Sequence, residues 1–256
     1  MEVERMALQD RVALVTGASS GLGAHFARVL AAHGARVLLA ARRVDALEEQ
    51  KAEIEAAGGR ADIVRLDVAD GGSVEAAFGS FDAADLRIDI VVNNAGISEA
   101  APALSVTAGD WDRVLDTNLK GVFLVAQAAA RRMQGDGRGG SIVNVASILG
   151  HRVAGNLASY AASKAGVVRL TEALALEWAR FGIRVNSLCP GYIETDLNRE
   201  FFASDAGKAL IRRIPQRRLG APSDLDGALL LLASDAGRYM TGSSITVDGG
   251  HLVSSL

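Results

Sequence analysis

Short apolar runs alternate with longer amphipathic stretches along the whole chain. The short runs are rich in β-branched residues, which is typical of buried strands. They predict strands at residues 12–16, 36–41, 61–66, 88–93, 141–146, 184–188 and 244–247. The longer stretches are rich in alanine and leucine, and they predict helices at about 21–33, 44–57, 73–84, 111–132, 156–180 and 223–232.

Strands that alternate with helices predict a parallel sheet covered by helices on both faces, because each crossover returns over the sheet. No linker rich in proline or serine divides the chain, so we expect one doubly wound α/β Rossmann domain over 1–256, with 1–8 as an N-terminal extension. Ligands of such sheets bind beyond the carboxyl ends of the strands. The residues that follow each strand are therefore the candidates for chemistry.

Composition excludes several other classes of protein. Hydrophobic residues make up 49% of the 256 residues, and the formal net charge is only −3. A chain without excess basic charge is a poor nucleic-acid binder. Its apolar runs fall short of the roughly 18 residues that a membrane helix needs, and residues 1–10 show no secretory signal. The single cysteine, Cys189, excludes an internal disulfide and a multi-cysteine metal site. We therefore expect a cytoplasmic protein without a metal or a membrane partner.

Glycines gather directly after the first predicted strand, where residues 16–23 read TGASSGLG. Glycine permits a tight turn there and lets the backbone meet a pyrophosphate at the start of a helix. The alternative is an ordinary strand-to-helix turn whose glycines serve packing. The segment predicts cofactor contacts at Gly17, Ser19, Ser20, Gly21, Leu22 and Gly23.

The end of the second strand bears on the choice of cofactor. NAD-binding proteins usually carry an acid there that bonds the ribose 2′-hydroxyl, whereas this chain has Arg42 and Arg43. A guanidinium pairs with a 2′-phosphate, so we favour NADP(H), with Arg42 as the chief contact and NAD(H) as the alternative. Two solvated arginines that begin a helix are the structural alternative.

Polar or small residues also follow the third and fourth strands. Asp67 and Val68 could border an adenine ring, although Asp67 could equally cap the next helix. Residues 93–96 read NNAG, and Asn94 and Gly96 would let the backbone approach a cofactor. A plain asparagine–glycine turn is the alternative.

A tyrosine and a lysine lie four residues apart in the helix predicted at 156–180, so Tyr160 and Lys164 share one helix face. A phenol needs its phenolate stabilised to exchange protons near neutral pH, and an adjacent cation does this. Ser147 follows the fifth strand at the same edge, where it could hold a carbonyl oxygen. Asn118 lies within a predicted helix, where a bond to backbone or a water link to Lys164 would explain it. Each residue also has an ordinary structural explanation.

Taken together, these motifs and Pro190-Gly191 resemble the short-chain dehydrogenase/reductase family from about residue 9 to residue 250. The resemblance implies a seven-stranded sheet and a homotetramer in which the helices of Asn118 and Tyr160 form one interface. It makes Tyr160 the general acid/base, Ser147 the carbonyl orienter, Lys164 the ribose-bound modifier of the tyrosine pKa, and Asn118 part of a proton relay. It also implies nicotinamide contacts at Pro190, Gly191, Ile193 and Thr195.

The expected activity is NADP(H)-dependent interconversion of a small-molecule ketone and secondary alcohol, with 3-oxoacyl thioesters as one candidate substrate class. The alternatives are an NAD-dependent secondary-alcohol, polyol or steroid dehydrogenase, and a dinucleotide-sensing regulator without turnover. We expect a lid over 195–214 with Leu197, Phe201 and Phe202 as apolar covers. Its arginines could steer an acidic carrier, or form a solvated helix face. The substrate contacts are expected at Ser147, Leu149, Asn156, Tyr160 and Tyr192.

Overall fold

A seven-stranded parallel sheet forms the centre of the computed structural model, which describes residues 6–84, 86–195 and 198–254. The strand order is β3-β2-β1-β4-β5-β6-β7, so the direction of winding reverses between β1 and β4. This arrangement confirms the predicted doubly wound Rossmann fold. The strands are β1 Val12–Thr16, β2 Arg36–Ala41, β3 Arg60–Arg65, β4 Ile90–Asn93, β5 Gly140–Val145, β6 Ile183–Pro190 and β7 Ser244–Val247.

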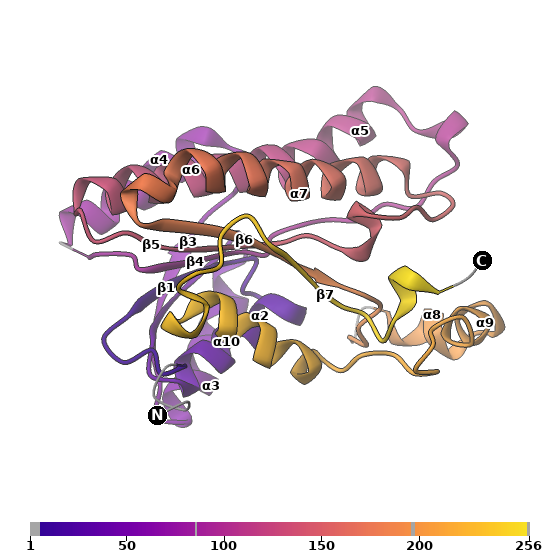
Figure 1. Ribbon diagram of the computed structural model, residues 1–256, viewed down its shortest axis with the longest axis horizontal. Helices are drawn as coiled ribbons and strands as arrows, with labels where there is room; N and C mark the ends of the chain where they lie inside the picture. The colour runs from indigo at the N-terminus through magenta and orange to yellow at the C-terminus, as the bar shows by residue number, and fades with distance from the viewer. Residues whose placement is uncertain (1–5, 85, 196–197, 255–256) are drawn as a thin grey trace.

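Helices cover both faces of the sheet (Figure 1). One layer holds α4 Gly71–Ala83, α5 Ala108–Leu115, α6 Gly121–Gly135 and α7 Ala158–Trp178. The other layer holds α2 Gly21–Ala32, α3 Val44–Ala56 and α10 Asp226–Ala233. Two short helices, α8 Arg199–Ala203 and α9 Asp205–Ile211, lie at one end of the molecule near the C-terminal segment.

The core consists of two layers because each strand is buried on both faces. In β1, Ala13 and Val15 pack in one hydrophobic cluster with Phe26 of α2, whereas Leu14 packs in the other with Val125 of α6. Successive side chains of a strand point to opposite faces, so both sets must be apolar. This is why the strands read as continuous apolar runs rather than as alternating ones.

The predicted helix at 111–132 differs most from the structure. It begins earlier, at Ala108, because Thr107 and Asp110 form a reciprocal capping box. It ends later, at Gly135, and a π-type turn over Asp116–Lys120 interrupts it. The other predicted elements are confirmed, with ends shifted by a few residues. None of the helices in the described part of the chain is both long and apolar enough to cross a membrane.

Candidate active site

A cavity of about 600 Å³ lies at the carboxyl ends of the strands, at the point where the winding reverses. It brings the predicted proton-transfer residues Ser147, Tyr160 and Lys164 together with the residues predicted to hold a cofactor. Of the latter, the cavity is lined by Gly17, Ser19, Ser20, Gly21, Leu22, Arg42, Asp67, Val68, Asn94, Gly96, Pro190, Gly191, Ile193 and Thr195.

The glycine-rich turn has the shape that an anion needs. Gly21 has a φ of +56°, and a Cβ atom built there would meet nothing within 4 Å, which leaves room beside the backbone. The N-cap residue of α2, Ser20, makes no side-chain hydrogen bond to the first helical turn. The first-turn N–H groups therefore suit a bound phosphate.

Gly23 lies beneath the turn rather than in the cavity, contrary to its predicted contact with the cofactor. A Cβ atom at Gly23 would lie 2.2 Å from the carbonyl oxygen of Gly17 and 2.5 Å from Nδ2 of Asn94. The residue must be glycine so that α2 can pack against the turn. Its role is in packing, and it acts on a ligand only through the shape of the turn.

Both arginines after β2 line the cavity, but they differ in what they contact. Arg43 Nη2 donates to Oγ of Ser19 at 3.1 Å and to Oγ of Ser20 at 3.0 Å. Arg42 is 72% exposed, and its Nη1 lies 3.9 Å from the carboxylate of Asp67. The sequence prediction considered both arginines and made Arg42 the chief contact. Arg43 is the N-cap residue of α3, and its extended backbone returns the side chain over the glycine-rich turn.

The side chains of Asp67 and Asn94 both form hydrogen bonds with backbone groups. Asp67 Oδ1 accepts from the backbone N–H of Ala69 at 3.1 Å, while the cap of α4 is Asp70. The alternative that Asp67 caps this helix is therefore wrong. Asn94 Nδ2 donates to the carbonyl oxygen of Thr16 at 3.1 Å and so ties the end of β4 to the glycine-rich turn.

Burial sets the protonation of the tyrosine and the lysine. The pKa of Tyr160 is raised by burial and by nearby Tyr192, and a hydrogen bond with Ser147 opposes this. Burial lowers the pKa of Lys164 to about 8. Lys164 Nζ donates to the carbonyl oxygen of Val145 at 2.8 Å and lies 5.7 Å from the centre of the Tyr160 ring. Contrary to expectation, the chain by itself does not lower the tyrosine pKa.

Asn118 lies in the π-type turn and is fully buried. Its Oδ1 accepts from the N–H of Ile97 and its Nδ2 donates to the carbonyl oxygen of Ile97, both at 2.8 Å. The predicted bond to backbone is thus present. A Cβ atom at Gly96 would lie 3.3 Å from Asn118 Oδ1 and 3.6 Å from Lys164 Nζ, so glycine lets the amide and the ammonium converge.

A second cavity, of about 880 Å³, adjoins the first at Tyr192, which lines both. Leu149 lines it as predicted for a substrate contact, but Asn156 lines neither cavity. Asn156 has a φ of +62° and lies on an exposed turn. Among the predicted lid residues, Phe202 packs on Tyr192 with ring centres 5.8 Å apart and Phe201 is half-exposed. Leu197 lies outside the described residues.

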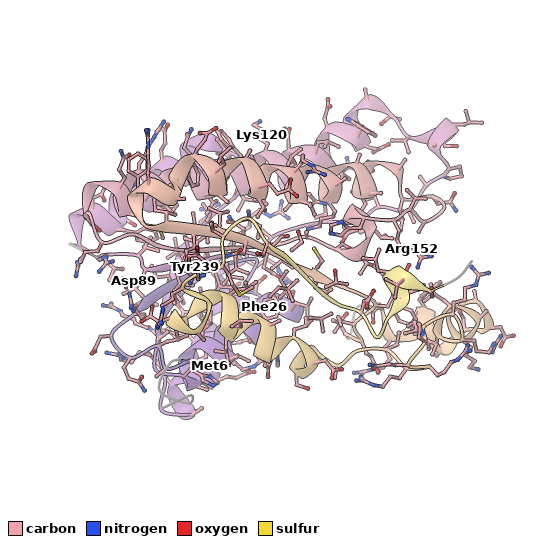
Figure 2. All side chains as sticks on the ribbon, viewed as in Figure 1. Met6, Phe26, Asp89, Lys120, Arg152 and Tyr239 are labelled. Atoms are coloured by element: carbon pink, nitrogen blue, oxygen red, sulfur yellow. The ribbon has the colours of Figure 1, made fainter. Side chains whose placement is uncertain are left out.

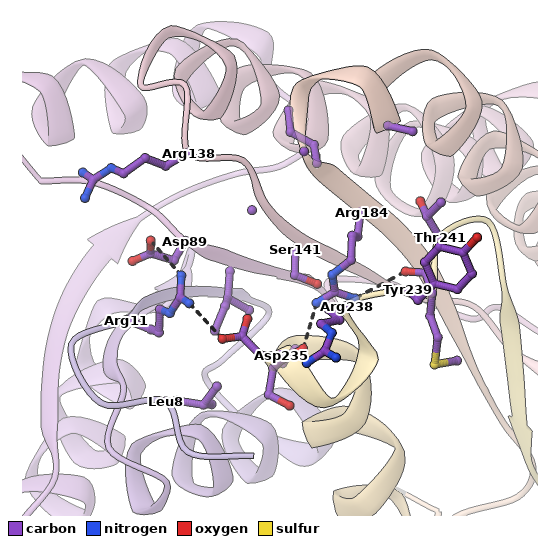
Figure 3. A pocket seen from close by; sticks show the side chains of 18 of the residues that line it. Leu8, Arg11, Asp89, Arg138, Ser141, Arg184, Asp235, Arg238, Tyr239 and Thr241 are labelled. Atoms are coloured by element: carbon purple, nitrogen blue, oxygen red, sulfur yellow. Dashed lines mark hydrogen bonds and ion pairs between the residues drawn. The ribbon is translucent and has the colours of Figure 1, made fainter. Parts of the chain in front are cut away.

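A third cavity, of about 600 Å³, opens at the amino ends of the strands (Figure 3). Arg11 lies between Asp89 and Asp235, at 3.7 Å and 3.4 Å, and Arg184 donates to backbone carbonyl groups. Figure 2 shows Asp89 in the left part of the molecule and Arg152 in the right part. Because the third cavity is at the edge away from Tyr160, it takes no part in the candidate site.

Comparison with known proteins agrees with this geometry. The family described as enoyl-(acyl carrier protein) reductase matches residues 17–251. A short-chain type dehydrogenase/reductase from Mycobacterium marinum is 42% identical, with 98% of this chain and 99% of that chain covered and a TM-score of 0.93. The chain belongs to the short-chain dehydrogenase/reductase family.

Two further relatives of this short-chain dehydrogenase/reductase are similarly close. D-threitol dehydrogenase of Mycolicibacterium smegmatis is 39% identical over 96% of this chain and 94% of the relative. The structure of a gluconate 5-dehydrogenase from Burkholderia cenocepacia J2315 in complex with NADP and tartrate is 38% identical, covers both chains fully and has a TM-score of 0.95. The protein is thus an oxidoreductase that acts on CH–OH donors. The alternative of a regulator without turnover is not supported.

Several residues of the two adjoining cavities escaped the sequence analysis or received too little weight in it. Arg43 was considered beside Arg42 but ranked below it, because no local pattern shows that its side chain returns over the glycine-rich turn. Arg152 and His251 carry no motif, and they meet only because the C-terminal segment folds back over the turn that follows Ser147.

Proposed function

We propose that this short-chain dehydrogenase/reductase interconverts a ketone and a secondary alcohol of a small polyhydroxylated molecule, with NADP(H) as its cofactor. The observation that carries the proposal is the position of Tyr160, Ser147 and Lys164 in one cavity with the glycine-rich turn. A substrate oxygen beside Tyr160 and a dinucleotide on that turn would share this space.

Tyr160 is the proposed general acid/base. In reduction, its phenol donates a proton to the substrate oxygen as the carbonyl carbon gains a hydride, which is the chemistry that bound NADPH supplies. Ser147, whose hydroxyl is near enough to Tyr160 to oppose the rise of its pKa, is proposed to hold the same oxygen. Lys164 lies close enough to favour the phenolate through its charge. Oxidation uses the same groups in reverse, with Tyr160 as the base.

Asn118 is proposed to position the site rather than to touch the substrate. Its side chain fixes Ile97 in the segment that follows β4, and so holds Gly96 beneath the Lys164 ammonium. A proton relay from Lys164 past Asn118 to solvent remains our proposal for the recharging of Tyr160.

The preference for NADP(H) is supported by charge. Arg42 and Arg43 border the cavity at the end of β2, and the second is held over Ser19 and Ser20. The serine hydroxyls and the guanidinium form a set of donors for a 2′-phosphate. The gluconate 5-dehydrogenase structure contains NADP, which agrees with this choice.

The relatives favour polyols and sugar acids as the substrate class, since their names specify D-threitol and gluconate. A 3-oxoacyl thioester is the second candidate. It is favoured by the acyl carrier protein in the description of the matching family and by the arginines around the second cavity.

A substrate panel tests the proposal. D-threitol, D-gluconate and acetoacetyl-CoA are each followed at the nicotinamide absorbance with both cofactors. We expect turnover of at least one polyol or sugar acid with NADP(H), and a loss of about 10²–10⁴-fold in kcat for Tyr160→Phe. Tyr239→Phe, at an exposed position away from the first cavity, is the matched control and should leave kcat unchanged. An active Tyr160→Phe variant would contradict the assignment.

The enzyme is also proposed to be a homotetramer with an interface over α6 and α7. An apolar groove on this layer supports the proposal, since exposed apolar surface favours association. Its apolar lining is Leu115, Leu119, Phe123, Gly166 and Leu170.

A further inference from the structure

The second cavity is lined by basic side chains of a single sign. Its lining contains four arginines and neither aspartate nor glutamate. Across the described segments, none of the four arginines forms an ion pair. Arginines near one another without acidic partners repel one another and form a site for an anion. The polar side chains that matter here are Arg152, Arg212, Arg213, Arg217, Tyr192 and His251.

A continuous row of side chains joins this basic group to the proposed acid/base. Tyr192 is near enough to Tyr160 to raise its pKa. The Tyr192 ring packs on His251 with centres 5.4 Å apart. Burial raises the pKa of Tyr192, and the charge of Arg152 opposes that shift. Burial lowers the pKa of His251, and the charges of Arg152 and Arg213 lower it further. Arg152 and Arg213 line the second cavity together with His251, which packs on the tyrosine shared by both cavities.

Arg152 is held in place by the fold. One of its Nη1 hydrogen bonds goes to the carbonyl oxygen of His251, and the same nitrogen lies 3.5 Å from Oγ of Ser254. Figure 2 shows Arg152 beside the C-terminal segment. Its backbone continues the short turn Ile148–Gly150, so its distance from Ser147 is fixed. A fixed guanidinium loses little freedom on binding an anion.

His251 lines the same cavity and holds an unpartnered polar atom beside its wall. The residue is 7% exposed, and its Nδ1 is buried without a hydrogen-bond partner. The nearby acid, Asp248, accepts hydrogen bonds from the backbone N–H groups of Gly250 and Leu252, at 2.8 Å and 2.5 Å. Its carboxylate is thus bound to the C-terminal turn and does not line the second cavity. A buried polar atom without a partner commonly marks a ligand site.

We propose that the second cavity binds a carboxylate group of the substrate through Arg152 and Arg213, so that the enzyme acts on hydroxy acids and oxo acids in preference to neutral polyols. The inference rests on the proposed function, which places the reacting carbon at Tyr160. The carboxylate then lies on the far side of Tyr192, and its binding orients the carbon chain across both cavities. A planar carboxylate matches the fork of a guanidinium.

Matched pairs of ligands test the proposal. D-gluconate and D-glucitol, and D-threonate and D-threitol, differ chiefly in one carboxylate. Their binding to the NADP⁺-loaded enzyme is measured by titration calorimetry. We expect the wild type to bind at least one acid about tenfold more tightly than its polyol. Arg152→Gln and Arg213→Gln should each remove most of that advantage and leave the polyol affinity unchanged.

Two further variants separate charge from folding. Arg152→Lys keeps the charge and should restore part of the acid affinity that Arg152→Gln loses. Arg28→Gln removes an exposed arginine that pairs with Glu53 on the distant α2–α3 surface, and it should bind every ligand as the wild type does. Because Arg152 also holds the C-terminal segment, Arg213→Gln provides the test should Arg152→Gln lower the Tm.

The outcomes distinguish this inference from the proposed function. Equal binding of acids and polyols by the wild type overturns the inference, and so does unchanged acid binding in Arg213→Gln and Arg152→Gln. An enzyme that binds acids through these arginines but oxidises neither an acid nor a polyol overturns the proposed function alone, whereas one that oxidises polyols and no acid overturns the inference. Turnover of acetoacetyl-CoA with no response to any free acid would assign the arginines to a thioester carrier instead.

Discussion

A buried ammonium lies at the centre of the site. Lys164 is 4% exposed, and its Nζ bonds to a backbone carbonyl oxygen rather than to an acid. Burying a cation without a carboxylate partner is unfavourable, because protein replaces water around the charge. The fold maintains this arrangement beside Tyr160, at a position where a positive charge would help a phenolate to form. We interpret the stability that is lost by burying the Lys164 ammonium as a consequence of its proposed role beside Tyr160.

The destabilising effect of the buried Lys164 should be measurable as a pH dependence of the free energy of unfolding of the cofactor-free enzyme. The pKa of Lys164 is about 8 in the folded chain against 10.5 for an ordinary lysine. Between these values the unfolded chain binds a proton that the folded chain does not, so the free energy of unfolding rises with pH. Lys164→Met removes this dependence. Its stability relative to wild type should therefore fall by about 2 kcal/mol between pH 7 and pH 10.

Chemical denaturation at several pH values measures this difference. Lys120→Met, at an exposed residue paired with Asp116, is the control and should show no comparable trend. A difference between Lys164→Met and wild type that stays constant over this pH range would show that the lysine is not buried as a strained cation.

Arg43 should matter more than Arg42 for the choice of cofactor. Arg43 is hydrogen-bonded over the glycine-rich turn, whereas Arg42 is largely exposed. Arg43→Ala should raise KM for NADPH about tenfold and change KM for NADH little, because only the former carries the 2′-phosphate. Arg42→Ala should have a smaller effect. Equal effects on both cofactors would contradict a phosphate contact.

At the scale of elements, the turn between β1 and α2 shows how packing and binding share residues. In the segment 16–23, Gly17 has a left-handed backbone, Gly21 has free space beside it, and Gly23 packs directly against the carbonyl group of Gly17. The same short segment closes the strand, starts the helix and shapes the cavity. Its spacing in the sequence was sufficient to locate the turn, but not to tell which glycine faces a ligand.

Gly23→Ala should therefore damage both stability and cofactor binding. The added methyl group would overlap the Gly17 carbonyl oxygen, and backbone atoms on both sides prevent an easy shift. We expect a loss of about 1–3 kcal/mol in the free energy of unfolding and weaker NADPH binding. Gly227→Ala in α10, where a Cβ meets nothing within 4 Å, should leave both unchanged or slightly improved. Thermal unfolding and fluorescence titration compare the two variants.

The π-type turn over Asp116–Lys120 is the element that the sequence did not reveal. A helix that is interrupted by a π-type turn has the same apolar pattern as a continuous helix. Periodicity therefore predicted one helix over 111–132. The extra residue in the turn changes the direction of the side chains that follow. The turn places Asn118 against Ile97, in the segment that follows β4, and against Ser163 of α7.

At the scale of the whole molecule, the candidate binding cavities and the ion pairs that stabilise the fold lie at opposite edges of the sheet. The two adjoining cavities lie at the carboxyl edge of the sheet, and the paired charges of Asp89, Arg11 and Asp235 lie at the amino edge. Parallel strands make this separation unavoidable, because all seven end at the same edge. The layer of α6 and α7 remains available for association with other copies.

The oligomeric state tests that layer. Phe123→Glu places a charge in the apolar groove and should convert the proposed tetramer to smaller species in light scattering. Leu104→Glu, at a fully exposed residue outside the groove, should leave the mass unchanged. A monomeric wild type would contradict the tetramer, and a Phe123→Glu variant of unchanged mass would exclude this groove as the interface.

The sequence by itself determined the strand and helix order, the Rossmann architecture, and the Tyr160, Lys164 and Ser147 set. These follow from local patterns: apolar runs of strand length, glycines at strand ends, and a helical spacing of four residues. Tertiary structure alone decided that Arg43 lies over the glycine-rich turn, that Gly23 serves packing, and that Asn156 lines neither cavity. It also brought Arg152, Arg213 and His251 together from distant parts of the chain. Such convergence depends on how the C-terminal segment and the segment that follows α9 meet around the second cavity. Long-range packing leaves no periodic pattern in the sequence of the residues that it brings together.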